Sequence, residues 1–232
     1  MHAPVALASR PPARGLRWPD PSAPLAVLAV EGREERADQG GSRAQRVAAQ
    51  ALAERDGGGG GRRDGSFQNV DEARAALRAV EALAAGGDVK SIALLTPYRG
   101  QVRVLERALR VLGDGWLPAG VDLVVSSVDA FQGREADAVV FSAVRCNARG
   151  SIGFVADPRR LNVAITRPKC GLAVVCSPRT LAAGSHHWDA FLRHAAARGA
   201  VVAADAALPP PRPRDGPDPF DPFAARRLSG FG

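Results

Sequence analysis

Three short segments of the chain bring together residue types that bind phosphate groups and nucleobases. The first is TPYRGQ at 96–101, which holds the only tyrosine of the chain, Tyr98. An aromatic ring followed by Arg99 and Gln101 could stack on a base and reach a phosphate group. The alternative needs no ligand, because a threonine cap and a proline in the first turn also begin an ordinary helix.

The second segment, SSVDAFQGREAD at 126–137, is a polar loop between two apolar stretches. Its Gly133 permits a backbone conformation, or a close approach, that other residues resist. Ser126 and Ser127 could donate hydrogen bonds to phosphate oxygens. Without a ligand, the same residues would form a polar connection between strands.

The third segment, DPRRLNVAITR at 157–167, combines a helical pattern with three arginines. Arg160 and Arg167 stand seven residues apart, so they share one helix face two turns apart and could reach one polyanion. Arg159 is turned away from Arg160 by about 100°. The alternative is a basic helix face that is simply solvated.

Apolar stretches alternate with helical patterns along the chain. The strands and helices that they predict would position the three segments. We predict strands at 25–30, 91–96, 121–128, 138–144, 171–176 and 200–203. Helical spacing of apolar residues predicts helices at 70–84, 102–112, 158–167 and 188–198, and 31–56 is expected to be a loop followed by a helix. This alternation indicates an α/β fold, a mostly parallel sheet with helices on both faces. Ligands bind at the carboxyl ends of the strands in such a sheet.

Composition limits the class of protein. The 232 residues suffice for one α/β domain but not for two, and no apolar run reaches the roughly 18 residues that span a bilayer. The formal charge of +7 comes almost wholly from arginine, which suits phosphate partners; a GC-rich coding bias is the alternative source. The three cysteines, Cys146, Cys170 and Cys176, show no close pairing and indicate a reducing compartment.

We expect one domain at 17–208. Residues 1–16 would be a disordered or truncated lead-in, which could belong to an organelle transit peptide or, as we favour, to a start inside a longer protein. The glycine-rich stretch 57–65 is expected to be a flexible insertion. The Pro-rich tail 209–232 lacks apolar periodicity and is expected to be disordered, with an extended proline segment that binds an SH3-like domain as the alternative.

The order and spacing of the three segments resemble the C-terminal RecA-like lobe of Upf-type superfamily 1 helicases, and within that group the up-frameshift RNA helicases of nonsense-mediated mRNA decay. The similar stretches are TPYRGQV at 96–102, SSVDAFQGREADAVVFSAVR at 126–145 and GFVADPRRLNVAITR at 153–167, with weaker similarity at 17–25, 30–35 and 66–73. The resemblance implies a RecA-like fold of the P-loop NTPase type. It also implies half of a site in which ATP, with Mg²⁺, lies between two lobes.

The resemblance assigns roles to individual residues. Arg167 would be the arginine finger on the γ-phosphate, with Arg160 in support. The residues that would contact ATP, from the adenine to the phosphates, are Tyr98, Arg99, Gln101, Gln132, Gly133 and Glu135. Those that would contact single-stranded RNA or DNA are Ser126, Ser127 and Arg145. The chain departs from the family at Pro168, where alanine is usual; because proline disfavours helical geometry in the residue before it, we expect Arg167 to be displaced from its usual pose, although we retain it as the finger.

One wall of the ATP site is missing from the sequence. A phosphate loop needs a lysine after a glycine, but Lys90 follows valine and Lys169 follows proline. We expect no metal site, because no acidic pair ends a strand as Mg²⁺ requires, and His186, His187 and His194 are interpreted as surface histidines. We therefore expect an ATP-dependent helicase lobe that is inactive as an ATPase without an N-terminal lobe. The alternative is a non-enzymatic nucleic-acid-binding or decoy domain derived from such a helicase.

The resemblance also implies partners and a compartment. The partners would be single-stranded RNA or DNA, an N-terminal RecA-like lobe in cis or in trans, and mRNA decay factors, with no role for a membrane. Together with the reduced cysteines it favours the cytoplasm; the nucleus is the alternative, and an organelle is less favoured.

Overall fold

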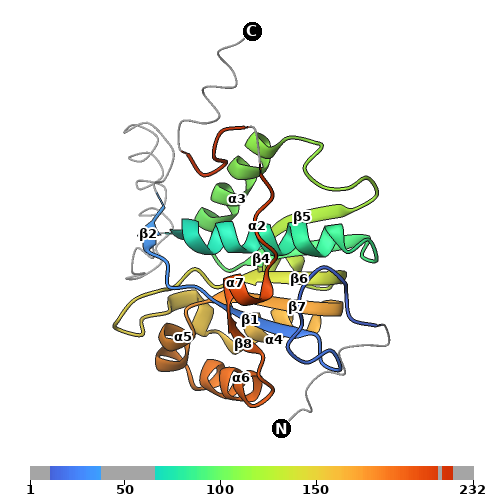
Figure 1. Ribbon diagram of the computed structural model, residues 1–232. Coiled ribbons are helices and arrows are strands. Elements are labelled where there is room, and N and C mark those ends of the chain that lie inside the picture. Colours follow the sequence, from blue (N-terminus) through green and yellow to red (C-terminus); the bar gives the residue numbers. More distant parts are fainter. Residues whose placement is uncertain (1–10, 38–65, 214–215, 222–232) are drawn as a thin grey trace, which may run out of the picture.

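The computed structural model describes residues 11–37, 66–213 and 216–221, and its centre is a six-stranded sheet (Figure 1). The strands are β1 (Leu25–Ala29), β4 (Ser91–Thr96), β5 (Asp122–Ser127), β6 (Ala136–Ser142), β7 (Pro168–Cys176) and β8 (Val201–Ala203). They lie in the order β5-β4-β6-β7-β1-β8, and every neighbouring pair is parallel. The predicted α/β fold is confirmed, and each of the six predicted strands is present.

Helices cover both faces of this sheet, as Figure 1 shows. One face carries α2 (Val70–Ala85), α3 (Arg99–Leu112) and α7 (Ala204–Ala207), and the other carries α4 (Pro158–Thr166), α5 (Pro178–Gly184) and α6 (His186–Ala197). In β4, Ile92 and Leu94 enter the core under α2, whereas Ala93 and Leu95 enter the opposite core. Because each inner strand is buried on both faces, its sequence is apolar over most of its length. No helix in the described ranges is long and apolar enough to cross a membrane.

Three features lie outside the sequence predictions. β2 (Glu34–Arg36) and β3 (Phe67–Asn69) form an antiparallel ribbon beside the main sheet, and α5 and the four-residue α7 are two further helices. Strands of three residues are too short to display a period. Helix α5 fully buries only Thr180 and Leu181, so it gives no apolar stripe. A loop followed by a helix is expected at 31–56. Of that stretch, residues 38–56 lie outside the described residues.

The described part of the N-terminal lead-in packs against the domain. Ala13 is buried, and its backbone N–H donates to the carbonyl of Cys170 at 3.1 Å. The ring of Trp18 lies on Gly171 of β7, where a Cβ atom would come within 2.5 Å of the ring, so glycine makes this contact possible. Contacts with the domain therefore begin before residue 17. Residues 1–10 and the glycine-rich stretch 57–65 lie outside the described residues.

Part of the Pro-rich tail lies on α2. Arg74 of this helix forms an ion pair with Asp218 at 3.0 Å, and Arg78 donates a hydrogen bond to the carbonyl of Pro209 at 3.0 Å. These contacts differ from the expectation of a tail without structure. Residues 214–215 and 222–232 of the tail lie outside the described residues.

Candidate functional site

Helix α4 and the connection 128–135 lie side by side, and we refer to these two segments together as the seam. At one end Arg160 donates two hydrogen bonds to the carboxylate of Asp129, at 2.9 and 2.8 Å. At the other end the carbonyl of Arg167 accepts from the N–H of Ala136 at 3.2 Å. The second and third chemistry-bearing segments of the sequence therefore meet at two places, near Asp129 and near Ala136.

A hollow of about 310 Å³ opens in the seam. Its lining residues are Val128, Asp129, Gln132, Asp157, Arg159, Arg160 and Val163. The structure thus brings together two of the predicted site residues, Gln132 and Arg160. The hydrogen bond from Arg160 is the main cause that lowers the pKa of Asp129. An incoming phosphate would have to replace Asp129 as the partner of Arg160.

Gly133 and Glu135 occupy the exposed turn of the seam. Gly133 has a φ of +81°, and a Cβ atom there would meet nothing within 4 Å. The glycine is therefore explained by its left-handed backbone and not by a close approach. Glu135 forms a solvent-exposed ion pair with Lys169 at 3.5 Å.

Arg167 is the C-cap residue of α4, and its backbone angles, φ −92° and ψ −24°, are helical. The expectation that Pro168 displaces the backbone of Arg167 is therefore wrong. Pro168 is paired with Ala136 at the start of β7, and this pairing outweighs the local preference against helical geometry. The guanidinium of Arg167 donates to the hydroxyl of Thr166 at 2.8 and 3.2 Å and forms no ion pair with a described acid.

Tyr98 lies under other aromatic rings instead of offering a free face. It is only 2% exposed, and its ring lies 5.7 Å from that of Phe67 and 6.1 Å from that of Phe154. Its hydroxyl donates to the carbonyl of Ile152 at 2.8 Å. Phe154 would have to move before Tyr98 could stack on a base. Its neighbour Arg99 is exposed at the start of α3.

Phe154 is a residue that the sequence reasoning missed. It is 42% exposed, the one large hydrophobic side chain of the described residues that is exposed. The guanidinium of Arg160 lies 5.2 Å from the centre of its ring. A single phenylalanine carries no periodic signal, so only the fold reveals this aromatic edge beside the seam.

Arg145 is buried in an ion pair. Its guanidinium donates two hydrogen bonds of 3.1 Å to Glu34 and lies 4.1 Å from the centre of the Phe67 ring. Burial acts to raise the pKa of Glu34, but hydrogen bonds from Arg145, Asn147 and the Cys146 backbone outweigh it and lower that pKa. In this conformation Arg145 has no free donor face toward a nucleic acid.

Ser126 and Ser127, the other two predicted nucleic-acid contacts, lie at the end of the edge strand β5. The hydroxyl of Ser127 accepts from the N–H of Ala130 at 3.3 Å, and the hydroxyl of Ser126 donates to the carbonyl of Ser127 at 3.2 Å. Both residues are half-buried. Arg145 lies instead beside Tyr98, so the three predicted residues do not form one surface.

A second hollow, of about 710 Å³, opens beside Arg145. Its lining residues are Glu34, Arg36, Phe67, Arg145, Asn147, Ala148, Arg149, Ser151 and Gly153. Arg36 and Arg149 are exposed there, whereas Glu34 neutralises Arg145. No sequence pattern indicates this basic hollow, because its residues come from the β2-β3 ribbon and from the loop after β6, which only the fold brings together.

Gln101 belongs to a buried polar cluster, which we define as Asn69, Glu72, Gln101 and Ser142. Gln101 is fully buried. Its carbonyl accepts from the N–H of Asn69 at 2.8 Å, and its amide donates to the Asn69 carbonyl and the Ser142 hydroxyl, both at 3.0 Å. A side chain that is wholly enclosed cannot touch a nucleotide, so we leave Gln101 out of the proposed ATP contacts.

Glu72 is the acid of this cluster. One carboxylate oxygen accepts from the Ser142 hydroxyl at 2.8 Å and from the N–H of Val144 at 2.7 Å, and the other has no hydrogen-bond partner among the described residues. Burial raises the pKa of Glu72 to about 8. Val144 has a φ of 73°, unusual for a β-branched residue, and its carbonyl accepts from the side chain of Asn69 at 3.1 Å.

Within the described ranges, no three His, Cys, Asp or Glu side chains are grouped in a way that could hold a metal ion. The rings of His186 and His187 lie 3.8 Å apart at the start of α6.

Comparison with known proteins shows that the chain is similar in sequence to a protein family and to several helicases. A protein-family model described as an AAA domain matches residues 2–179. The chain is 36% identical over 165 residues to a Drosophila melanogaster protein named regulator of nonsense transcripts 1 homolog, which covers 71% of this chain and 12% of that protein. It is 39% identical over 138 residues to the ATP-dependent helicase NAM7 of Saccharomyces cerevisiae (59% of this chain, 14% of that protein). It is 42% identical over 113 residues to the DNA polymerase alpha-associated DNA helicase A of Schizosaccharomyces pombe (47% and 16%). The matches therefore span 12% to 16% of the length of these three relatives.

Proposed function

The chain belongs to the AAA domain family as a Upf-type superfamily 1 helicase lobe, and from this premise we propose that it forms one wall of an ATP site. A second lobe that carries a phosphate loop forms the other wall, in cis or in trans. The chain alone then binds nucleic acid and hydrolyses no ATP.

The seam is the observation that carries this proposal. Gln132 and Arg160 line one hollow, and Arg167, free of any described acid, lies two turns further along the same helix, roughly 10 Å away at 1.5 Å per residue. Two guanidinium groups on one helix face match an extended polyanion such as a triphosphate.

The chemistry that we assign to Arg167 is charge stabilisation. Negative charge spreads over the phosphoryl oxygens as the bond to the γ-phosphate breaks, and a rigid guanidinium lowers the energy of that state. Bound ATP with Mg²⁺ would provide the reacting phosphate. The acids along the seam are already engaged, Asp129 with Arg160, Glu135 with Lys169, and Asp157 with the backbone N–H of Arg159. We therefore assign the ligands of Mg²⁺ to the other lobe.

For nucleic acid we propose single-stranded RNA or DNA, bound through its backbone. The relatives' names support both polymers, since one names a regulator of nonsense transcripts and another a DNA helicase. Because Arg145 is buried, we assign the contacts to Ser126, Ser127 and the exposed arginines of the basic hollow, Arg36 and Arg149. Backbone binding predicts an affinity that falls steeply with salt.

A second candidate function is a non-enzymatic nucleic-acid-binding domain. The specific observation in its favour is that Tyr98 is covered by Phe154 and that Arg160 is already held by Asp129. In that case the seam never closes on a nucleotide. Cytoplasmic localisation and contact with mRNA decay factors are further proposals that rest on the relatives, with the nucleus as the alternative compartment.

Reconstitution tests the proposal. The chain is mixed with a separately expressed N-terminal lobe of a related helicase, and RNA-stimulated phosphate release is measured. We expect activity in the mixture and none in the chain alone. Arg167→Ala should abolish the activity, whereas Arg193→Ala, which changes an exposed arginine of α6 that pairs with Asp189 of its own helix, should not.

Two outcomes contradict the proposal. Phosphate release by the chain alone, if lost in Arg167→Ala, would mean that the chain holds a complete site. Nucleic-acid binding without any restored ATPase activity would favour the non-enzymatic alternative.

A further inference from the structure

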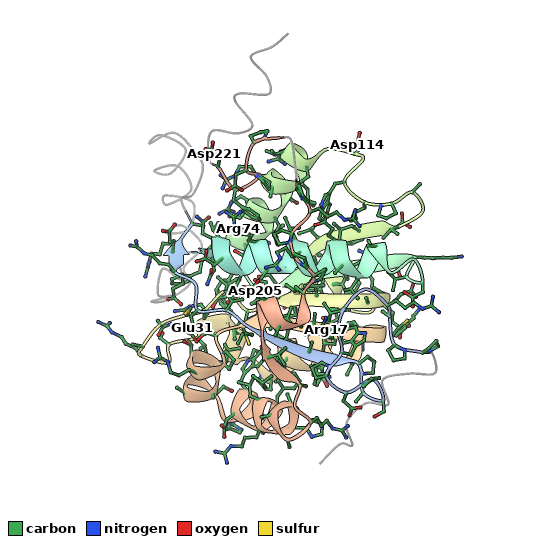
Figure 2. The ribbon with its side chains drawn as sticks, viewed as in Figure 1. Arg17, Glu31, Arg74, Asp114, Asp205 and Asp221 are labelled. Atoms are coloured by element: carbon green, nitrogen blue, oxygen red, sulfur yellow. The ribbon has the colours of Figure 1, made fainter. Side chains whose placement is uncertain are left out.

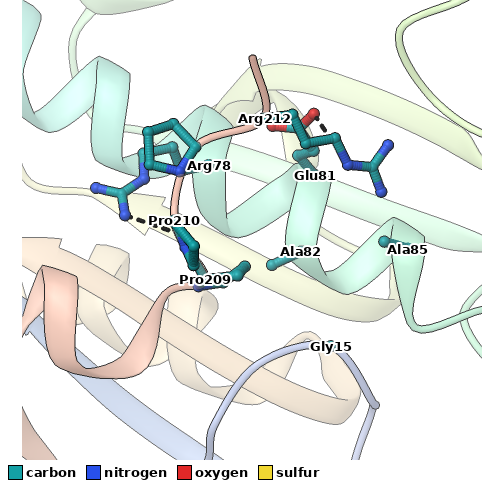
Figure 3. A pocket seen from close by; sticks show the side chains of 9 residues that line it. Gly15, Arg78, Glu81, Ala82, Ala85, Pro209, Pro210 and Arg212 are labelled. Atoms are coloured by element: carbon teal, nitrogen blue, oxygen red, sulfur yellow. Dashed lines mark hydrogen bonds and ion pairs between the residues drawn. The ribbon is translucent and has the colours of Figure 1, made fainter.

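The outer face of α2 carries charged side chains that are matched by the C-terminal strap, which we define as residues 209–213 and 216–221. The ion pairs along this face are Arg74 with Asp218, Glu81 with Arg212, and Arg78 with Asp205 of α7. Figure 2 marks Arg74, Asp205 and Asp221, and Figure 3 shows Arg212 and Pro209 of the strap turned toward Glu81 and Arg78. Charge along the strap is therefore complementary to charge along the helix.

Asp218 and Phe220 hold Arg74 in two ways. The guanidinium donates to both carboxylate oxygens of Asp218, at 3.1 and 3.0 Å, and it lies 4.8 Å from the centre of the Phe220 ring. Asp218 also accepts from the N–H of Phe220 at 3.0 Å, so the acid orients the aromatic ring over the arginine. The hydrogen bonds from Arg74 lower the pKa of Asp218. A fork to a carboxylate combined with a stacked ring is a specific recognition geometry.

The prolines of the strap favour this docking. Pro209, Pro210 and Pro211 precede the Asp-Pro-Phe sequence, and further prolines stand at 213, 217 and 219. Proline restricts the free chain, so less conformational freedom is lost on docking. Beside the strap a hollow of about 310 Å³ remains, bordered on the domain side by Leu77 and Leu112. The face of α2 is thus a groove with an apolar floor and charged edges.

We infer that this groove recognises the sequence Asp-Pro-Phe and that the strap is its ligand in cis. The chain carries the motif twice in succession, at 218–220 and again at 221–223. The partner that such a groove fits in trans is a Pro-rich peptide with an Asp-Pro-Phe motif. Because α2 and α4 lie on opposite faces of the sheet, the inference does not depend on the proposed function.

Peptide binding to the full chain tests this inference. The probe is a fluorescein-labelled peptide of residues 214–226, and binding is followed by fluorescence anisotropy. In a full-length variant without its own motifs, each Asp and Phe of both copies is replaced: Asp218→Ala, Phe220→Ala, Asp221→Ala and Phe223→Ala. This variant should bind the peptide, and the unchanged chain should bind it at least about tenfold more weakly, because the tethered strap competes at an effective concentration in the millimolar range.

Changes in the groove complete the design. Added to the motif-free variant, Arg74→Ala should abolish peptide binding, and Arg74→Lys should weaken it because a lysine cannot form the fork. Arg193→Ala is the matched control and should leave binding unchanged. A peptide with alanine in place of both phenylalanines should not bind. Circular dichroism establishes that each variant is folded.

Three results would overturn the inference. The first is a folded motif-free variant that does not bind the peptide. The second is equal binding by the motif-free variant and the unchanged chain, which would mean that the strap does not occupy the groove in solution. The third is a dimer that forms with rising concentration and disappears in Arg74→Ala, which would place the strap on a second copy of the chain.

Discussion

The buried polar cluster and the seam each contain a glutamine, yet the two regions differ in how their polar groups are satisfied. Gln101 makes three hydrogen bonds inside the protein and is fully buried. Gln132 in the seam is exposed and lines a hollow. Gln101 therefore completes its hydrogen bonds within the fold, whereas Gln132 keeps its amide group available for a ligand. Residue type alone therefore does not separate a structural glutamine from a ligand-binding one.

The difference predicts opposite responses to mutation. A change in the cluster leaves buried groups without partners and lowers the free energy of unfolding. A change in the seam removes a group that is exposed or half-buried and belongs to no buried hydrogen-bond network, which costs little stability but removes function. Four variants test this division, from the largest expected effect to the smallest.

Arg167→Ala should have the largest effect, and on activity alone. An arginine finger contributes roughly 10³–10⁵ in rate, or about 4–7 kcal/mol in the activation barrier. We expect a loss of that order in the reconstituted ATPase, measured as kcat, with an unchanged urea midpoint. A marked fall in the urea midpoint together with the loss of activity would instead mean that Arg167 supports the fold.

Gln101→Leu should destabilise the fold strongly. It removes all three hydrogen bonds and leaves the buried N–H of Asn69 without its acceptor, for a loss of about 2–4 kcal/mol in the free energy of unfolding. Gln132→Leu is the matched control and should change it by no more than about 0.5 kcal/mol. Urea denaturation measures both; similar losses in the two variants would remove the distinction between cluster and seam.

Glu72→Gln should change how stability depends on pH. The pKa of Glu72 is about 8 in the folded chain, above its ordinary value of 4.5, so the folded chain holds the proton more tightly than the unfolded chain. The stabilisation is complete below pH 4.5 and is lost as pH rises through about 8, by at most about 1.4 kcal/mol per pH unit.

The glutamine variant carries no such proton, so its free energy of unfolding should fall less between pH 5 and pH 8. Urea denaturation of both proteins at each pH unit gives the difference. Other titrating groups contribute equally to both proteins and cancel. Parallel pH profiles would contradict the raised pKa.

Arg160→Ala should lower stability only slightly. Its partner Asp129 is 63% exposed in its side chain, and exposed ion pairs contribute about 0–1 kcal/mol. We expect a loss of no more than about 1 kcal/mol by urea denaturation, together with reduced activity in the reconstituted assay. A loss well above 2 kcal/mol would move Arg160 from the seam to the structural scaffold.

The main sheet could be predicted from the sequence because its strands are buried on both faces. Residues 92–95 and 171–176 are apolar throughout, and this pattern leaves few alternatives. The β2-β3 ribbon could not be predicted in the same way, since its strands have three residues each. The local rule also failed at Arg167, which precedes Pro168. A residue before a proline disfavours helical geometry, but the pairing of Pro168 with Ala136 outweighs that preference.

The candidate site was predictable only in part. Spacing along a helix placed Arg160 and Arg167 on one face, because that periodicity is local. The burial of Tyr98, Gln101 and Arg145 depends on residues far away in the sequence, such as Phe154, Asn69 and Glu34. No motif spacing records those partners, so the resemblance assigned ligand contacts to side chains that the fold encloses.

The backbone of Val144 has a consequence for the loop that follows β6. A β-branched residue in left-handed geometry stores strain on the order of 1–3 kcal/mol, and Val144 is held there by a hydrogen bond at each end of its residue, from its N–H to Glu72 and from Asn69 to its carbonyl. Glu72 therefore links the protonation state of the buried polar cluster to one of the two hydrogen bonds that hold this loop. The loop that carries Arg145 therefore keeps its present course because two hydrogen bonds hold Val144 in a backbone conformation that this residue disfavours.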